Sequence, residues 1–390
     1  MAASGPPCYL WFVLGWLRRL LDRGAESPPP ASLVTATSGA ASAHPGAGAR
    51  PPREDLPESV EVDLSDDGPF APFARALGVP PPVEPPLLAE EAELEELRLC
   101  ERILEHCRRH RLGPSSAPTM SLRILTLVAS PSAEVSEMAR LISADPALSA
   151  GVLTVANSVA YRGLDEIETV REAVTRLGLD EVGRVAGALS AKSLFSPQAR
   201  LGLQAFGPRF AELYHRSISI ATAAAALAMR ARARSDRAYL GGLLHDVGRT
   251  VALRAVSDLS RAGALGLEPG DPRLERAIDR VHVEVGAELH QEWSLPQYLT
   301  VLAVRHHDEA VPAGPEFVDL HVVRLAAAVH DVRAEGPGAW RAAREILQSA
   351  GTLRLDPNGV RALAADLRQA EEKVRSTFGL EGAAQPPRRA

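Results

Sequence analysis

The sequence predicts an all-α protein, a two-part helical bundle preceded by a disordered N-terminal linker. Beyond residue 87, apolar residues recur at spacings of three and four, which is the period of a helix that buries one face. Aromatic residues make up only 4% of the chain and runs of β-branched residues are sparse, so strands are disfavoured. Proline and glycine separate the periodic segments and divide them into helices of ordinary length.

A chain of 390 residues is long enough for two or three domains, and its composition changes along its length. The net charge of −6 comes without a basic stripe, so no nucleic-acid partner is expected. Three scattered cysteines cannot form a disulfide framework, which favours a cytoplasmic location. We divide the chain into an amphipathic N-terminal segment (1–24), a disordered linker rich in proline, alanine and serine (25–86), a lead-in helix (87–110), a helical domain (111–332) and C-terminal helices (333–390).

The N-terminal segment contains an apolar run at residues 8–17. This run is too short to span a membrane, which takes about 20 apolar residues. Its arginines follow the run, whereas a signal peptide carries its positive charges before it. One helical face collects Leu10, Val13, Leu14, Leu17 and Leu21. Two interpretations stay open: residues 8–21 make peripheral contact with a membrane or a partner, or they form a terminus without a role.

The linker at residues 25–86 cannot bury enough apolar surface to offset the entropy lost on ordering. We expect it to be disordered, with one transient turn at 69–77. The lead-in helix that follows begins with five glutamates between Glu90 and Glu96. Carboxylates favour the positive end of a helix dipole, so we expect these glutamates to be solvated.

A series of short helices opens the helical domain. Segments 122–128, Val135–Ser143 and Val170–Leu177 are amphipathic, and Gly178 ends the last of them. Asp145 and Pro146 are typical of an N-cap and a first helical position. At the other end of the chain, helices are expected at 339–347 and 360–378. The last of these has an apolar stripe that would pack on the bundle or on a second copy of it, forming a homodimer.

The segment 243–248 places His245 and Asp246 within an apolar run that reads as a buried helix. Buried polar groups need partners, and a buried carboxylate needs one most. Either the two side chains bind a divalent metal with ligands from other helices, or they satisfy each other and nearby backbone groups. Gly241 and Gly242, just before them, are expected to allow close helix packing.

Several separated motifs, in order, resemble the HDOD domain over about residues 111–332. They are Ala144-Asp145-Pro146, Ala156-Asn157-Ser158, Arg171-Glu172-Ala173-Val174, Arg176-Leu177-Gly178, His215, Gly242-Leu243-Leu244-His245-Asp246-Val247-Gly248, His282-Val283-Glu284-Val285-Gly286, Trp293-Ser294-Leu295-Pro296 and His306-His307. The resemblance implies a helical subdomain followed by a degenerate HD-type helical core. HDOD domains are related to HD phosphohydrolases and HD-GYP phosphodiesterases, but they act as output modules of bacterial signalling without established catalysis.

The resemblance also implies a set of candidate metal ligands for Fe, Mn or Zn. Carried over residue by residue, they are His215 for the first histidine of the HD pattern, His245 and Asp246 for its name-giving pair, His282, and His306 and His307 for the double histidine of HD-GYP enzymes. By contrast, His290 and His321 are expected on helix surfaces.

The sequence departs from the HD enzymes in two respects. Residues 323–328 place alanine where those enzymes supply a late aspartate, and Asp331 lies about one turn further along. The glycine-tyrosine-proline motif of the phosphodiesterases is missing after His307. We interpret these histidines as a buried polar cluster that is inherited from an enzyme and fixes the helix register, and metal binding without turnover stays open as an alternative. We expect a non-catalytic regulatory module that binds a signalling partner or a small ligand between its two subdomains, and the alternative is a metal-dependent phosphohydrolase or cyclic-dinucleotide phosphodiesterase.

Overall fold

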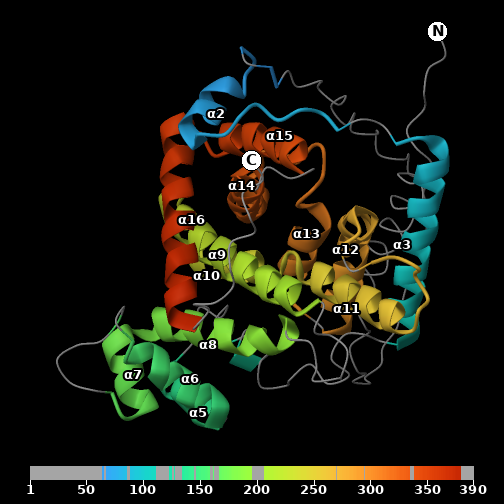
Figure 1. The fold of residues 1–390 in the computed structure, drawn as a ribbon. Coiled ribbons are helices and arrows are strands. Elements are labelled where there is room, and N and C mark those ends of the chain that lie inside the picture. The colour runs from blue at the N-terminus through green and yellow to red at the C-terminus, as the bar shows by residue number, and fades with distance from the viewer. Residues whose placement is uncertain are drawn as a thin grey trace, which may run out of the picture. The chain divides into compact units, whose positions relative to one another are not determined.

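All regular elements in the described part of the computed structural model are helical, which confirms the all-α prediction (Figure 1). The predicted segment 1–24 and the linker up to residue 63 lie outside the residues that the structure describes. The described residues all belong to one compact unit, Leu56–Ala390. None of the described helices has the length and apolar character needed to cross a membrane. The structure describes residues 64–65, 67–85, 88–110, 123–124, 127, 134–144, 146–158, 161, 167–195, 206–268, 270–293, 295–333 and 338–378.

The first subdomain is a small bundle with a hydrophobic core of its own. Its helices are α5 (Val135–Ser143), α6 (Pro146–Ala156), α7 (Val170–Leu177) and α8 (Leu179–Phe195). A capping box starts α7, in which Thr169 and Glu172 satisfy each other's backbone N–H groups. Gly178 ends α7 with a φ of 80°, a conformation that favours glycine. The predicted helix 122–128 lies largely outside the described residues, as does Asp145.

A second group of helices surrounds the segment that carries His245 and Asp246. It comprises α9 (Gly207–Arg230), α10 (Ser235–Leu244), α11 (Val247–Arg261), α12 (Pro272–Glu292), α13 (Gln297–Arg305), the short 3-10 helix η2 (Pro315–Phe317) and α14 (Val318–Arg333). Alanines fill much of the buried face of α9, so neighbouring helices can approach it closely. The two-part bundle predicted from the sequence is thereby confirmed.

Four more helices pack on the same core: α2 (Ala71–Leu77), α3 (Glu90–His110), α15 (Ala339–Thr352) and α16 (Pro357–Phe378). Helix α2 corrects the expectation of a transient turn within a disordered linker. Phe70 is fully buried beside it, Gly78 caps it with a φ of 69°, and the helix packs against α16 (Figure 1). Contact with a distant helix stabilises a segment whose own composition predicts no order.

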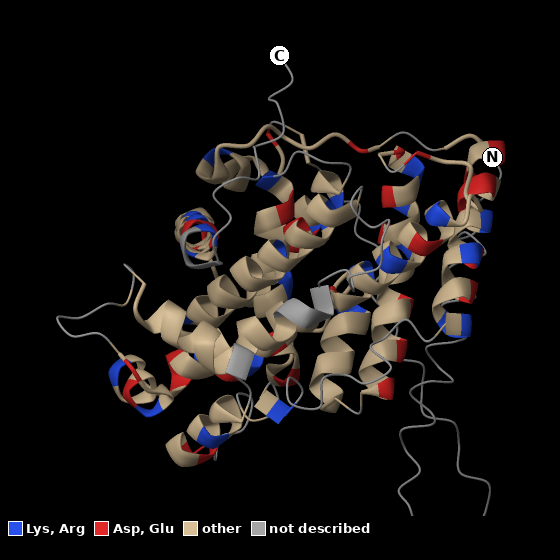
Figure 2. Cartoon of the chain, turned by 60° about the horizontal axis from the view of Figure 1, so that its bottom comes forward, with Lys and Arg blue, Asp and Glu red and all other residues tan. Residues whose placement is uncertain are grey.

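The acidic start of α3 is also only partly solvated. Glu96 is 1% exposed, and its two oxygens each lie 2.6 Å from an arginine of α12, Arg276 and Arg280. The expectation that all five glutamates are solvated was therefore wrong at Glu96, because two cations compensate the burial of its charge. Elsewhere, acidic and basic segments mix along the helices, without a stripe of one sign in the described residues of this view (Figure 2).

Two glycines bring helix backbones into direct contact and so position the segment that carries His245 and Asp246. A Cβ on Gly242 would lie 2.6 Å from the Cα of Ala221 in α9, which confirms the expected close packing. A Cβ on Gly248 would lie 2.0 Å from the carbonyl oxygen of His282 and 2.6 Å from the backbone nitrogen of Gly286. Helices α11 and α12 therefore touch backbone to backbone, two residues after Asp246.

Replacing Gly248 with alanine should lower the free energy of unfolding by about 2 kcal/mol or more, because the added methyl group would overlap the His282 carbonyl. Urea unfolding of the full-length chain measures the change. Gly351→Ala is the matched control, since no neighbouring atom outside its own helix lies within 4 Å of the added Cβ. Alanine favours a helix there, so the control should be neutral or stabilising by about 0.5–1 kcal/mol. Equal losses in both variants would contradict this interpretation.

Candidate metal centre

Asp246 stands at the junction of α10 and α11 and is 3% exposed. Helix α10 ends at Leu244, and Asp246 is the residue before the first turn of α11. The positive end of the α11 dipole favours a carboxylate at this position. The break between the two helices thus presents the charge of Asp246 to the interior of the core.

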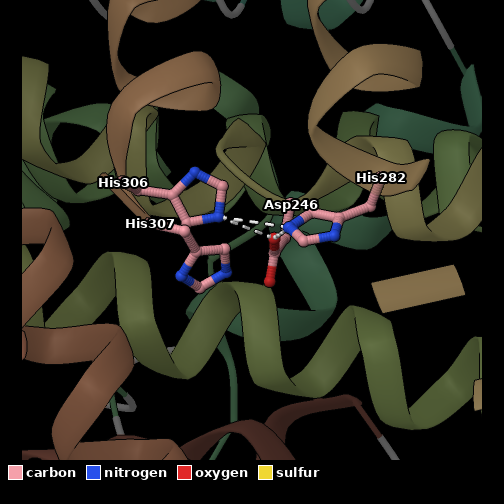
Figure 3. Close-up of side chains that lie close together, drawn as sticks. All are labelled: Asp246, His282, His306 and His307. Atoms are coloured by element: carbon pink, nitrogen blue, oxygen red, sulfur yellow. Dashed lines mark hydrogen bonds and ion pairs between the residues drawn. The ribbon is translucent and has the colours of Figure 1, made fainter. Parts of the chain in front are cut away.

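Four side chains converge at this junction (Figure 3). They are Asp246, His282 from α12, and His306 and His307 from the end of α13, and one ligand atom from each lies within 4.8 Å of all the others. Three of these atoms form a nearly equilateral triangle. Asp246 Oδ1 lies 3.3 Å from His282 Nε2 and 3.2 Å from His306 Nε2, and the two nitrogens are 3.4 Å apart.

Backbone carbonyls fix which nitrogen of each imidazole faces the centre. Nδ1 of His282 donates to the carbonyl of Asp279 at 2.6 Å, and Nδ1 of His306 donates to that of Ala303 at 2.9 Å. Each Nε2 therefore carries a lone pair, as in histidines that bind metals. Burial, followed by repulsion from Arg249, holds the pKa of His282 well below its usual value, so this imidazole is neutral.

The triangle has the dimensions of a metal-ligand face. Nitrogen and oxygen ligands about 2.0–2.2 Å from a metal in tetrahedral geometry lie roughly 3.4 Å from one another. Within the described part of the chain, Asp246 Oδ1 and His307 Nε2 are buried without a hydrogen-bond partner. Two nitrogen lone pairs and a carboxylate oxygen face one another, and a cation between them would relieve their repulsion. The residues therefore fit a divalent metal.

A carboxylate supports His307 from behind. Nδ1 of His307 lies 2.7 Å from Oε1 of Glu345 in α15. This contact leaves Nε2 of His307 directed toward the centre of the four side chains. Burial raises the pKa of Glu345 to about 7 against the opposing effect of Arg341. A carboxylate behind an imidazole orients the ring and raises its basicity in known metal sites.

The second oxygen of Asp246 faces two arginines. Oδ2 forms ion pairs with Arg216 of α9 and with Arg249 of α11, the latter at 3.1 Å. Arg216 also binds the carboxylate of Asp331 through two nitrogens, with Nε donating to Oδ1 at 3.1 Å and Nη2 donating to Oδ2 at 2.8 Å. Burial alone would raise the pKa of Asp246, but the two guanidinium groups hold it well below its usual value. Asp246 is therefore ionised at neutral pH.

The remaining predicted ligands lie differently. His245 donates from Nδ1 to the Gly242 carbonyl at 2.9 Å, and its Nε2 lies 3.5 Å from Asp246 Oδ2, on the arginine side. His215 does not join the four converging residues, and its neighbour Arg216 contacts Asp246 instead. Asp331, one turn beyond the expected late aspartate, is bound to the same arginine.

Two other histidines correct the sequence prediction. His290 and His321 were expected on helix surfaces, yet both are fully buried. His290 Nε2 lies 3.3 Å from the Leu244 carbonyl. His321 has Nδ1 at 3.2 Å from Ser349 Oγ and Nε2 at 3.1 Å from the Pro312 carbonyl. Hydrogen bonds within the core satisfy both nitrogens of His321 and Nε2 of His290, whereas Nδ1 of His290 is buried without a hydrogen-bond partner among the residues that the structure describes.

Sequence reasoning also missed the functional importance of Arg216 and Arg249. A weak signal was available for Arg249, because it follows Asp246 by three residues at the start of a helix and the two side chains share a face. For Arg216 the sequence offers only its position next to His215. The partners of Arg216 are distant in the chain and meet only in the folded core.

Comparisons with known proteins agree with this architecture. The family model of the HDOD domain matches residues 115–309. A solved HDOD domain protein of unknown function from Geobacter sulfurreducens is 25% identical, covers 71% of this chain and 99% of its own, and has a TM-score of 0.52. A candidate metal-dependent phosphohydrolase from Shewanella amazonensis is 19% identical, with coverage of 73% and 99% and a TM-score of 0.53, and is similar in fold. A search of curated proteins found no match.

Replacing Arg216 with methionine should lower the free energy of unfolding by about 3–5 kcal/mol, because it removes one of the two guanidinium partners of buried Asp246 and the guanidinium that binds partly buried Asp331. Arg230→Met is the matched control, since Arg230 pairs with Asp366 at the surface and its side chain is 42% exposed. The control should cost less than about 1 kcal/mol. Urea unfolding at neutral pH measures the free energy of unfolding of both variants. A loss in Arg216→Met as small as that in the control would contradict the importance of the ion pairs that Arg216 forms.

Proposed function

Because the chain belongs to the HDOD family, we propose that it is a regulatory module of bacterial signalling that binds a protein partner or small ligand and does not hydrolyse phosphate esters. One observation carries the non-catalytic part of this proposal. Arg216 is bound both to Asp246, the aspartate of the HD pair, and to Asp331, which lies about one turn beyond the position of the late aspartate in HD enzymes. We place the protein in the cytoplasm.

Arg216 opposes hydrolysis through its charge and its position. A guanidinium group does not deprotonate in proteins, so it remains a fixed cation on both carboxylates. Its side chain is 12% exposed, and its Nε and Nη2 donate two parallel hydrogen bonds to the two oxygens of Asp331. A metal on this side of Asp246 would have to displace the arginine and leave its charge buried without a partner. The side of Asp246 that faces Arg216 and Asp331 is therefore closed to metal chemistry.

The histidine half supports a single metal ion. Asp246, His282, His306 and His307 would hold iron, manganese or zinc, and such an ion supplies Lewis acidity when bound. In this chain its proposed role is structural, since its ligands come from the start of α11, from α12 and from the end of α13. The ion would tie these helices together.

Catalysis is the second candidate, and the same four residues are the observation that favours it. They form a nitrogen and oxygen ligand set of the kind that metal-dependent phosphohydrolases use, and the Shewanella amazonensis protein is described as a candidate for that class. The regulatory module requires at most a bound metal ion, whereas the phosphohydrolase also requires turnover of a phosphate ester.

We expect the purified full-length chain to hold close to one divalent ion after incubation with zinc, manganese or iron and removal of excess metal. Plasma mass spectrometry measures the content. His282→Ala and His306→Ala should lose the ion, because each removes one corner of the ligand triangle. His215→Ala is the matched control and should keep it. Wild-type protein without metal, or retention by the His282 variant, would contradict the proposed ion.

Hydrolysis of bis(4-nitrophenyl) phosphate and of a cyclic dinucleotide should be the same for the metal-loaded wild type as for the double variant His245→Ala, Asp246→Ala. The double variant should have a lower thermal midpoint, because it removes one of the two carboxylates that pair with each of Arg216 and Arg249. Turnover in the wild type that disappears in the double variant would establish the enzyme instead.

A further inference from the structure

A cavity of about 200 Å³ lies where the first subdomain meets the core and the C-terminal helix. Helices α6, α8, α9, α10 and α16 all contribute to its walls. Its apolar lining includes Val155, Ile218, Ala226, Val374 and the ring of Tyr239, and Met229 stands at the rim with 67% of its surface exposed. Helix α16 lies outside residues 115–309, so this cavity depends on a part of the chain beyond the family match.

One wall of the cavity carries charge. Glu181 of α8 accepts a hydrogen bond from the Tyr161 hydroxyl and pairs with Arg184 at 2.7 Å and with Lys373 of α16 at 3.0 Å. The Lys373 ammonium also lies 4.3 Å from the centre of the Tyr161 ring. Two cations, Arg184 and Lys373, thus pair with one carboxylate at this wall of the cavity.

The other polar groups of the lining use their protons inside the protein. The hydroxyls of Thr222, Ser235 and Tyr239 donate to the carbonyls of Ile218, Ala225 and Arg184, at 2.9, 3.1 and 2.9 Å. The side of the cavity away from the charged wall is therefore suited to an apolar group.

The size of the cavity restricts the ligand. An apolar cavity of about 150 Å³ is known to accept benzene. A cavity of about 200 Å³ suits an apolar body of roughly six to ten carbons.

We propose that this cavity binds a small amphipathic carboxylate, with its apolar body between the subdomains and its carboxylate at Lys373 and Arg184. The proposal rests on the proposed function, because it specifies the small ligand of a regulatory module. A ligand in this position contacts α8 of the first subdomain, α9 of the core and α16 of the C-terminal region (Figure 1). Its binding therefore joins three parts of the chain.

Octanoate is the probe, and calorimetric titration of the full-length chain measures its affinity. Octylamine and octanol carry the same apolar chain with a positive or neutral head, and both should bind more weakly than octanoate. Lys373→Met removes the cation and should weaken octanoate binding about fivefold, the upper range for a partly exposed ion pair, without changing octanol binding. Ala226→Leu fills the cavity and should abolish binding of both.

Two variants on α16 serve as matched controls. Arg375→Met removes an exposed positive charge outside the cavity, and Ala365→Leu adds the same bulk as Ala226→Leu at an exposed position. Both should bind octanoate as the wild type does. Absence of octanoate binding, unchanged affinity in Lys373→Met, or equal binding of octylamine would each overturn the proposal. None of these outcomes involves the metal centre, so they remain distinct from the hydrolysis result that decides the proposed function.

Discussion

The two oxygens of the Asp246 carboxylate face different partners, and the packing of the core helices depends on both. Oδ1 faces His282 and His306, and Oδ2 faces Arg216 and Arg249. A buried carboxylate that loses its partners costs several kcal/mol, so this residue ties α9, α11, α12 and α13 to one arrangement. The side of Asp246 that faces His282 and His306 is suited to a metal ion. On the other side, Arg216 and Arg249 supply the positive charge.

The helices were predictable where their signals are local. Val135–Ser143 and Val170–Leu177 have the bounds expected from the sequence, because the apolar period of each helix, and for the second its capping box and Gly178, act within a few residues. Helix α2 was not predictable in this way. The burial of Phe70 depends on α16, which lies almost 300 residues further along the chain, and composition alone carries no information about that contact.

The candidate site was predictable as far as the family resemblance reaches. Asp246, His282, His306 and His307 do converge, although they come from different helices. The arginines were missed because their pairing is long-range: Arg216 and Asp331 are 115 residues apart. Burial of Glu96, His290 and His321 was missed for the same reason, since the groups that compensate each of them lie on other elements. A sequence pattern shows where a polar residue lies in the chain, but it does not show which distant groups will pair with that residue when it is buried.

The backbone contact at Gly248 restricts how the core helices can move relative to one another. Interfaces made of side chains can adjust by changing rotamers, whereas α11 and α12 meet at Gly248 and Gly286 with no side chain between them. The relative position of the two helices at this crossing is therefore fixed, and we expect α11 and α12 to move together as a rigid body. Conformational change would therefore occur at the junction between the first subdomain and the core, where side chains such as Lys373 and Glu181 form the contact.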